Sequence, residues 1–237
     1  MQYVAEQIYR QHPDVLLDLT FEVWGEKHVI DYGLIEAGDV DWVSNVDDNK
    51  PNSAGPRQAR TLIYQRALAI PVETMLVGCL RADVSPVEER YATTIASGPL
   101  LLGDLRTLTP EQQDWYGERI RWFKDLRKQI AINEGFFPVG AWLQPSAASL
   151  DGFLRLNRQG EGLLVVFRNK SKEDKLKVEV PVFPDGTFHA RSKITGKPWG
   201  IFTGAQMRRG IEFQVPPGHK VEVLEIRKEK GSETSAP

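Results

Sequence analysis

The chain has 237 residues and a nearly balanced charge, with 30 Lys and Arg against 32 Asp and Glu, which argues against nucleic acid or an anionic membrane as its main partner. No apolar run reaches the roughly 18 residues of a transmembrane helix, so we expect a globular chain without a membrane partner. One cysteine and four histidines that lack ligand spacing predict neither an internal disulfide nor a metal site.

The first half of the chain alternates predicted helices and strands. Apolar residues at helical spacing predict a helix over 2–12, and the apolar run that follows predicts a buried strand over 14–20. Later strands and helices are expected, in chain order, at 40–46 (strand), 57–69 (helix), 70–78 (strand), 85–96 (helix), 97–103 (strand) and 109–132 (helix). This alternation is typical of βα units on a parallel sheet.

Two of these helices carry sequence signals at their starts. Ser85-Pro86-Val87-Glu88 and Thr109-Pro110-Glu111-Gln112 both have the pattern of a capping box with proline at the first helical position. The apolar residues expected on the buried side of the last helix are Trp115, Ile120, Trp122, Phe123, Leu126 and Ile130.

The composition changes near 135–138, and helical periodicity is absent after Ser149. Short alternating runs then predict strands at 150–156, 162–168, 176–183, 186–194, 211–215 and 221–226. Strands at this spacing favour an antiparallel sandwich. We therefore expect one domain over 1–134, a β domain over 135–228, and a charged, disordered tail over 229–237.

The most suggestive stretch is Asp39 to Asp48, a short strand that contains Trp42 and runs into a loop rich in aspartate. A carboxylate can act as a general acid or base when burial or a second carboxylate tunes its pKa, and a tryptophan can stack on a sugar. A solvated loop that supplies the N-cap of the helix after Pro56 would explain the same residues. Local spacing leaves both explanations open.

Several other residues allow a structural and a functional reading. Arg57 and Arg60 begin the next predicted helix, and either could pair with an aspartate of the loop and lower its pKa. Cys79 is expected to be a small buried residue, because no histidine is near it in sequence. We expect Asp104 to cap the turn that follows it, and Trp199 to pack in the core of the β domain.

Three motifs in this order resemble a known family. They are Glu22-x-x-Gly25 after a strand, Trp42-Val43-Ser44-Asn45-Val46-Asp47-Asp48, and Ser97 to Asp104, followed by a long helix and a β-sandwich. The chain thereby resembles the α-galactosidase (melibiase) group, in the clan of glycoside hydrolase families 27, 31 and 36. The resemblance implies an α/β fold made of strands five to eight of a (β/α)8 barrel, followed by an antiparallel β-sandwich.

Members of this group are retaining glycosidases that use two aspartates about 5–5.5 Å apart. The acid/base stands at the end of the sixth strand, which the resemblance assigns to Asp47 or Asp48, with a slight preference for Asp47. In the other register the position falls on Asn45, which cannot transfer a proton. The resemblance also implies that Glu22, Trp24, Trp42, Asn45 and Arg81 contact the sugar, and that no metal or organic cofactor is needed.

The nucleophile of the family stands on the fourth strand, which the resemblance does not cover. We therefore expect a fragment of a longer polypeptide, or a split gene whose other half supplies strands one to four, and no activity from this chain alone. The expected partners are a carbohydrate substrate and the missing half of the barrel. A non-catalytic carbohydrate-binding or structural fragment is the alternative, with Asn45 marking the lost proton donor. The compartment stays open, because any signal peptide would precede this segment.

Overall fold

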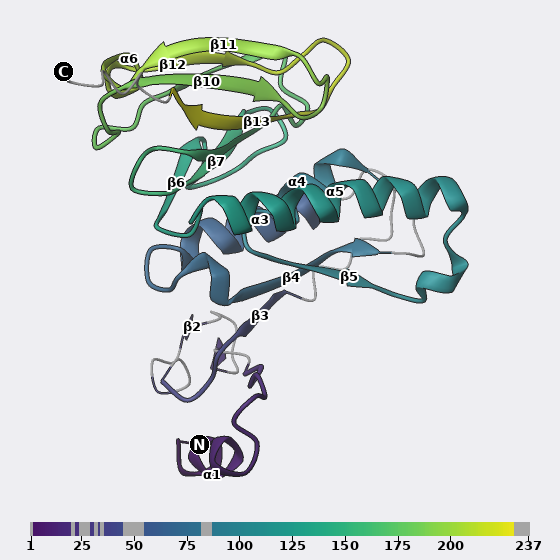
Figure 1. The fold of residues 1–237 in the computed structure, drawn as a ribbon. Helices are drawn as coiled ribbons and strands as arrows, with labels where there is room; N and C mark the ends of the chain where they lie inside the picture. The colour runs from purple at the N-terminus through teal and green to yellow at the C-terminus, as the bar shows by residue number, and fades with distance from the viewer. Residues whose placement is uncertain are drawn as a thin grey trace, which may run out of the picture. The chain divides into compact units, whose positions relative to one another are not determined.

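The computed structural model describes residues 2–19, 22–23, 29–30, 33, 36–44, 55–81 and 87–229 (Figure 1). The chain divides into two compact units, Met1–Thr109 and Pro110–Pro237. Among the described residues, no helix combines the length and the apolar character that crossing a membrane requires. The domain boundary expected after residue 134 stays a prediction, and the expected tail lies outside the described residues from 230 onward.

The first unit contains a parallel sheet of three strands in the order β3-β4-β5. The helices and strands of this unit are α1 (Gln2–Gln11), β1 (Glu22–Val23), β2 (Val29–Ile30), β3 (Asp41–Ser44), α3 (Gly55–Arg66), β4 (Met75–Arg81), α4 (Glu88–Thr94) and β5 (Gly98–Leu102). Short 3-10 turns span Val72–Thr74 and Leu105–Thr107. The predicted alternation of helices and parallel strands is thus confirmed from β3 to β5.

Two predicted boundaries in this unit are wrong. In the described residues, the strand expected over 14–20 is reduced to a single parallel bridge between Asp18 and Val40. In this bridge the Leu17 carbonyl accepts from the amides of Asp39 and Val40, and the Leu19 amide donates to the Val40 carbonyl. The helix expected from Ser85 begins at Glu88, and its N-cap is Val87, which has no side-chain cap. The expected half barrel is not confirmed, since the described strands form an open sheet.

Both helices that follow β3 and β4 lie on the same side of the sheet, as Figure 1 shows. Helices α3 and α4 contact each other, and both pack on β4. Met75 and Val77 are buried on this side, whereas the paired residues Trp42 and Leu76 are only half-buried. Because residues alternate along a strand, Trp42 and Leu76 face away from the helices. Parallel sheets are normally covered on both faces, but in the described residues helices α3 and α4 cover only one.

In the described residues, the second unit contains the long helix α5, the short helix α6 and two antiparallel sheets. Its elements are α5 (Pro110–Gln129), β6 (Gly135–Gly140), β7 (Asp151–Leu156), β8 (Gly162–Phe167), β9 (Lys175–Val178), β10 (Thr187–Ser192), β11 (Pro198–Thr203), α6 (Gly204–Arg209), β12 (Ile211–Gln214) and β13 (Val221–Lys228). Six strands form one sheet in the order β11-β10-β13-β8-β7-β6, and β9 pairs with β12 in the other. The antiparallel β domain predicted from sequence is confirmed.

The two faces of the six-stranded sheet bury different partners. Leu154, Leu164 and Leu224 on one face share a core with Val178 of β9 and Phe213 of β12, as expected of two stacked sheets. On the other face lies α5, whose Trp122 donates from Nε1 to the carboxylate of Glu225 at 2.9 Å. Every residue of β7 and β8 is therefore buried.

Three of the six side chains expected on the buried side of α5 and just after it are buried, and Ile120 is among the three that are partly exposed. Phe123, Leu126 and Ile130 are buried, while Trp115 and Trp122 are partly exposed and carry basic side chains over their rings. The core prediction for Trp199 is confirmed, because its ring stacks on Phe213 with the ring centroids 4.5 Å apart.

Candidate functional site

The carboxyl ends of β3 and β4 meet at one edge of the parallel sheet, and each contains an irregularity. The register between β3 and β4 shifts between Trp42 and Ser44. The register between β4 and β5 shifts between Val77 and Leu80. Such bulges often re-aim side chains beside active sites. Of the residues that the sequence predicts to be functional, Asn45, Asp47 and Asp48 follow β3, and Arg81 is the last residue of β4.

The structure describes only part of the predicted site. Trp42 lies in β3, half-buried on the face away from the helices. Arg81 is the last residue of β4, and Glu22 pairs with Ile30 in the two-stranded ribbon of β1 and β2. The structure describes the backbone of Arg81 and Glu22 but not their side chains. The remaining predicted residues, Trp24, Asn45, Asp47 and Asp48, lie outside the described residues altogether.

A buried ion pair lies one residue before Trp42. The carboxylate of Asp41 is fully buried and lies 2.7 Å from Nη1 of Arg66, whose side chain is 5% exposed. Burial lowers the pKa of the Arg66 guanidinium, because the charged form loses its hydration. Arg66 is in the last turn of α3, so the pair ties that helix to β3. Asp41 points toward the helices, and its neighbour Trp42 is thereby directed to the opposite face.

A second buried arginine links the two helices. The guanidinium of Arg60 donates to Oγ1 of Thr93 at 3.1 Å and lies 3.6 Å from the carboxylate of Glu89. Arg60 is fully buried, and both of these partners belong to α4. A buried arginine needs such hydrogen bonds to compensate for lost hydration. These contacts give Arg60 a structural role beside the one predicted from sequence.

The aspartate that opens the suggestive stretch is engaged in a structural contact. Oδ2 of Asp39 accepts from the Tyr9 hydroxyl at 2.5 Å and from the Leu17 amide at 2.8 Å. The hydrogen bond from Tyr9 lowers the pKa of Asp39 the most, and the hydrogen bond from the Leu17 amide lowers it further. The hydrogen bond between Tyr9 and Asp39 also raises the pKa of Tyr9. Asp39 thus connects α1 and the segment that contains Asp18 to β3.

The capping role expected for Asp104 is confirmed. Its side chain accepts from the amide of Arg106 at 3.0 Å, and its carboxylate also binds the Arg106 guanidinium at 2.7 Å. The Arg106 hydrogen bonds lower the pKa of Asp104. Within the described residues no cluster of His, Cys, Asp or Glu could hold a metal ion.

Sequence reasoning missed the Asp41–Arg66 pair. A signal was present, because Asp41 interrupts an otherwise apolar strand with a side chain that alternation directs to the helix-covered face. The identity of its partner depends on how α3 packs, which no local pattern specifies.

The fold is similar to that of solved α-galactosidases, several of them of family GH36. The α-galactosidase AgaB of family GH36 from Geobacillus stearothermophilus superposes on 95% of this chain with a TM-score of 0.69 and 16% sequence identity.

The α-galactosidase from Lactobacillus brevis matches 96% of the chain with a TM-score of 0.65 and 12% identity. A β-L-arabinopyranosidase of family GH27 from Geobacillus stearothermophilus matches 97%, with a TM-score of 0.55 and 9% identity. The chain spans 30% of AgaB, 31% of the Lactobacillus enzyme and 55% of the arabinopyranosidase. No protein-family model and no curated protein sequence matches the chain.

Proposed function

We propose that these 237 residues are part of a retaining glycoside hydrolase that acts on terminal α-linked sugars, as an α-galactosidase does. The observation that carries this proposal is the superposition of 95% of the chain on GH36 α-galactosidases. Two related structures of AgaA contain raffinose and 1-deoxygalactonojirimycin. We extend the carbohydrate ligand to this chain as part of the proposal.

In this proposal, β3, β4 and β5 are the sixth, seventh and eighth strands of a (β/α)8 barrel, and the segment around Asp18 is the fifth. The strands are parallel and adjacent in chain order, and α3 and α4 cover one face only. A doubly wound sheet would carry helices on both faces, whereas a barrel keeps them all outside. The half-buried face of Trp42 and Leu76 then becomes the barrel interior.

The proposed chemistry uses two carboxylates in two steps. Asp47, or Asp48 in the neighbouring register, protonates the leaving oxygen while a nucleophilic carboxylate from the fourth strand bonds to the anomeric carbon. The same aspartate then removes a proton from water, and the resulting hydroxide displaces the nucleophile. Trp42 offers an apolar platform for the sugar ring, and Glu22, Trp24, Asn45 and Arg81 complete its binding site. The two steps need no metal and no organic cofactor.

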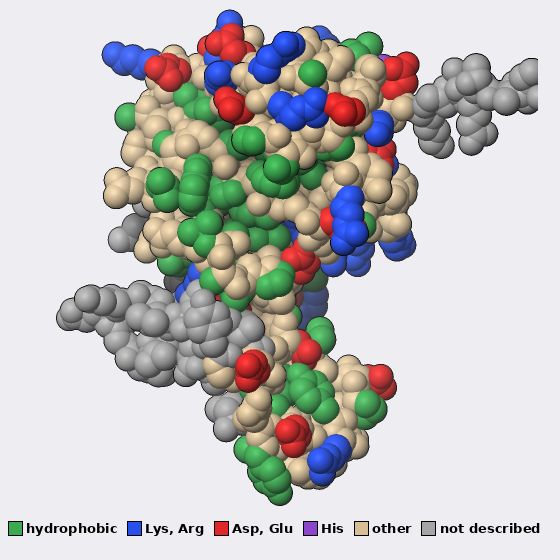
Figure 2. Space-filling model, turned by 90° about the vertical axis from the view of Figure 1, so that its left-hand side faces the viewer, with side chains coloured by type: hydrophobic (Ala, Val, Ile, Leu, Met, Phe, Trp, Pro, Cys, Tyr) green, Lys and Arg blue, Asp and Glu red, His purple; other side chains and the backbone are tan. Residues whose placement is uncertain are grey.

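The proposed partner of the chain is the remaining half of the barrel. The backbone groups of Leu17 and Leu19 bond to Asp39 and Val40, just before β3, whereas no hydrogen bond involves the backbone of Leu16 or Asp18 in the described part of the chain. In a parallel strand with one unpaired edge, residues whose backbone groups are hydrogen-bonded alternate in this way with residues whose backbone groups are not. Around this edge large apolar side chains are exposed, namely Tyr3, Val4, Val15 and Leu16. Figure 2 shows hydrophobic side chains on the surface at the bottom of its view, at the height of α1 in Figure 1. Free edges and apolar surface of this kind are normally covered.

Substitution of the two candidate acids tests the assignment in the complete enzyme. We expect Asp47→Asn to reduce hydrolysis of a natural α-galactoside by about 10²–10⁴-fold, the usual contribution of a general acid or base. The reduction should be smaller for an aryl α-galactoside, whose leaving group needs less protonation. Asp114→Asn, at an exposed position of α5, is the matched control and should leave activity unchanged. Full activity in both Asp47→Asn and Asp48→Asn would refute the assignment.

The alternative is a non-catalytic carbohydrate-binding or structural fragment, motivated by Asn45 at the position where one register requires the proton donor. The two functions differ in one measurement on the complete protein. Saturable binding of an α-galactoside without any hydrolysis would favour the alternative, and turnover that depends on Asp47 or Asp48 would exclude it.

A further inference from the structure

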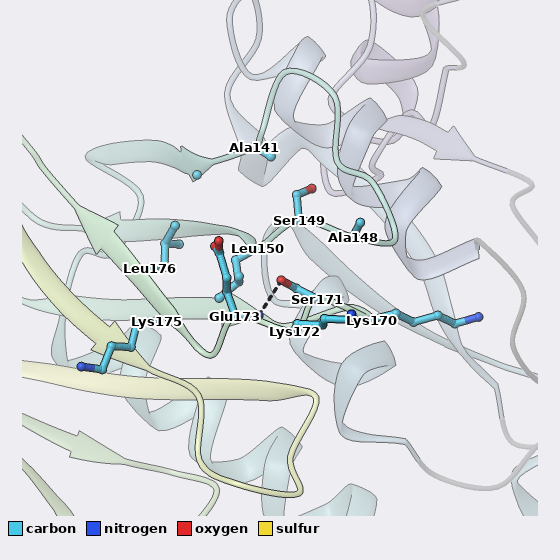
Figure 3. Close-up of a pocket in the computed structure, with 11 residues that line it drawn as sticks. Ala141, Ala148, Ser149, Leu150, Lys170, Ser171, Lys172, Glu173, Lys175 and Leu176 are labelled. Carbon is cyan, nitrogen blue, oxygen red and sulfur yellow. Dashed lines mark hydrogen bonds between the residues drawn. The ribbon is translucent and has the colours of Figure 1, made fainter.

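The second unit contains a cavity of about 610 Å³ between the β6–β7 loop and the β8–β9 loop (Figure 3). Its volume lies within the range of about 300–1,000 Å³ that small-molecule sites occupy. All of its lining residues belong to the second unit. The cavity therefore shares no residue with the proposed catalytic site, whose residues belong to the first unit.

Hydrogen bonds between the two loops hold the walls of this cavity in place. Nδ2 of Asn169 donates to the Ser149 carbonyl and to the Asp151 carboxylate, both at 2.7 Å. The amide of Lys170 donates to the Ala147 carbonyl at 2.7 Å. Asn169 has a φ of +56°, a left-handed conformation that asparagine tolerates better than most residues. A site that is already formed has little ordering entropy to lose when a ligand binds.

The cavity combines an apolar floor with a carboxylate on its rim. Leu150 and Leu176 supply the apolar surface, and Figure 3 shows the Glu173 side chain pointing toward the space between them. The Ser171 hydroxyl accepts from the amide of Glu173 at 3.1 Å and fixes the turn that carries it. The Glu173 carboxylate makes no hydrogen bond or ion pair in the described part of the chain, so it is available to a ligand.

Three lysines and one glutamate line the cavity, namely Lys170, Lys172, Lys175 and Glu173. In Figure 3 the amino groups of Lys170 and Lys175 diverge to opposite sides, away from the cavity. Lys175 is also 3.7 Å from the Glu212 carboxylate. The Glu173 carboxylate is directed inward, where it accepts hydrogen bonds and repels anions.

From this geometry we propose that the cavity is a second carbohydrate-binding site, for a neutral sugar. The C–H face of a pyranose ring would pack on Leu150 and Leu176, and two of its hydroxyl groups would donate to the carboxylate of Glu173. Hydrogen bonds to an ionised acceptor are about twice as strong as neutral ones. The proposal does not depend on the catalytic assignment, because no residue of the first unit contributes to the site.

Nuclear magnetic resonance titration of the ¹⁵N-labelled chain tests the proposal, with methyl α-D-galactopyranoside, raffinose and inorganic phosphate as separate probes. We expect a sugar to shift the amides of 140–150 and 169–176 saturably, and phosphate to leave them unchanged. Glu173→Gln should weaken the binding about tenfold, as expected for the loss of a charge-assisted hydrogen bond. The matched control Glu179→Gln, at an exposed position just after β9, should bind like the unaltered chain.

The variant Trp42→Ala distinguishes binding in this cavity from binding at the proposed catalytic site. We expect the sugar to shift the amides of 140–150 and 169–176 in this variant as it does in the unaltered chain. No saturable shift with either sugar, or binding of phosphate in their place, would overturn the proposal. Equal weakening by Glu173→Gln and Glu179→Gln would overturn it as well. The spectra of the variants report folding directly, so a misfolded variant is recognised as such.

Discussion

The buried pair of Asp41 and Arg66 gives the sharpest prediction about the first unit. Asp41 is fully buried and Arg66 is 5% exposed, with 2.7 Å between the carboxylate and Nη1. Replacing Asp41 by Ala leaves the guanidinium buried without this carboxylate. Breaking a buried pair in this way costs about 3–5 kcal/mol in the free energy of unfolding. We expect Arg66→Met to cost a similar amount, because it leaves the Asp41 carboxylate without the guanidinium.

Urea unfolding of the 237-residue chain, followed by circular dichroism, measures these changes. The double variant Asp41→Ala with Arg66→Met removes both charges, and we expect it to cost less than the sum of the single variants by about 1–3 kcal/mol. As a control, Arg106→Met removes the 89% exposed partner of Asp104 and should not change stability measurably. Additive costs, or single variants that lose less than about 1 kcal/mol, would show that the pair does not hold β3 to α3.

Three further predictions concern the second unit. Phe213→Ala removes a fully buried ring that stacks on Trp199 and should cost about 3–5 kcal/mol in urea unfolding; a cost near zero would contradict the described core. Gly140 has a φ of +66°, and a Cβ there would lie 2.7 Å from the Leu150 carbonyl oxygen, so Gly140→Ala should lower the melting temperature, whereas an unchanged value would contradict this backbone. Burial raises the pKa of Glu222 above 4.5, so the native state binds this proton more tightly than the unfolded state does. Its contribution to stability is therefore complete below pH 4.5 and is lost as pH rises through the folded-state pKa. Urea unfolding at pH 4 and pH 7 measures the difference in stability between Glu222→Gln and the unaltered chain. This difference should favour Glu222→Gln more at pH 7 than at pH 4, and an equal difference at both pH values would contradict a raised pKa of Glu222.

Sequence periodicity predicted most of the strands of the β domain but missed the two at the edges of the large sheet. The missed strands are β6 and β11, which contain Pro138 and Pro198. Proline lacks the amide that a central strand needs, and it is confined to edges and ends of sheets. In sequence these runs therefore resemble turns. Their position at an edge, which makes proline acceptable, is a property of the whole sheet and not of the local pattern.

The strand predicted over 176–183 ended early for a related reason. Strand β9 stops at Val178, and the amide of Val180 donates to Met207 of α6 instead of continuing a ladder. Alternation continues past this point in sequence, but the pairing strand β12 is only four residues long. The length of the partner thus sets the end of β9.

For the candidate site, the sequence predicts Trp42 and the loop after it, which stays a prediction, but not the contacts around Trp42. The alternation of Asp41 and Trp42 follows from the period of a strand, whereas the bulge after Trp42 and the pairing of Asp41 with Arg66 come from tertiary packing. Asp104 could be predicted because its cap contacts are within two residues in sequence. Local contacts are readable from sequence, and contacts across 25 residues, such as that of Arg66 with Asp41, are not.

The most direct test of the account is the stereochemistry of hydrolysis by the complete enzyme. Proton nuclear magnetic resonance can follow an aryl α-galactoside and identify the anomer that is released first. A retaining mechanism with two carboxylates about 5–5.5 Å apart releases the α-anomer before mutarotation, and this is the result we expect. Release of the β-anomer, or no hydrolysis by an enzyme that contains all eight barrel strands, would contradict the proposed function.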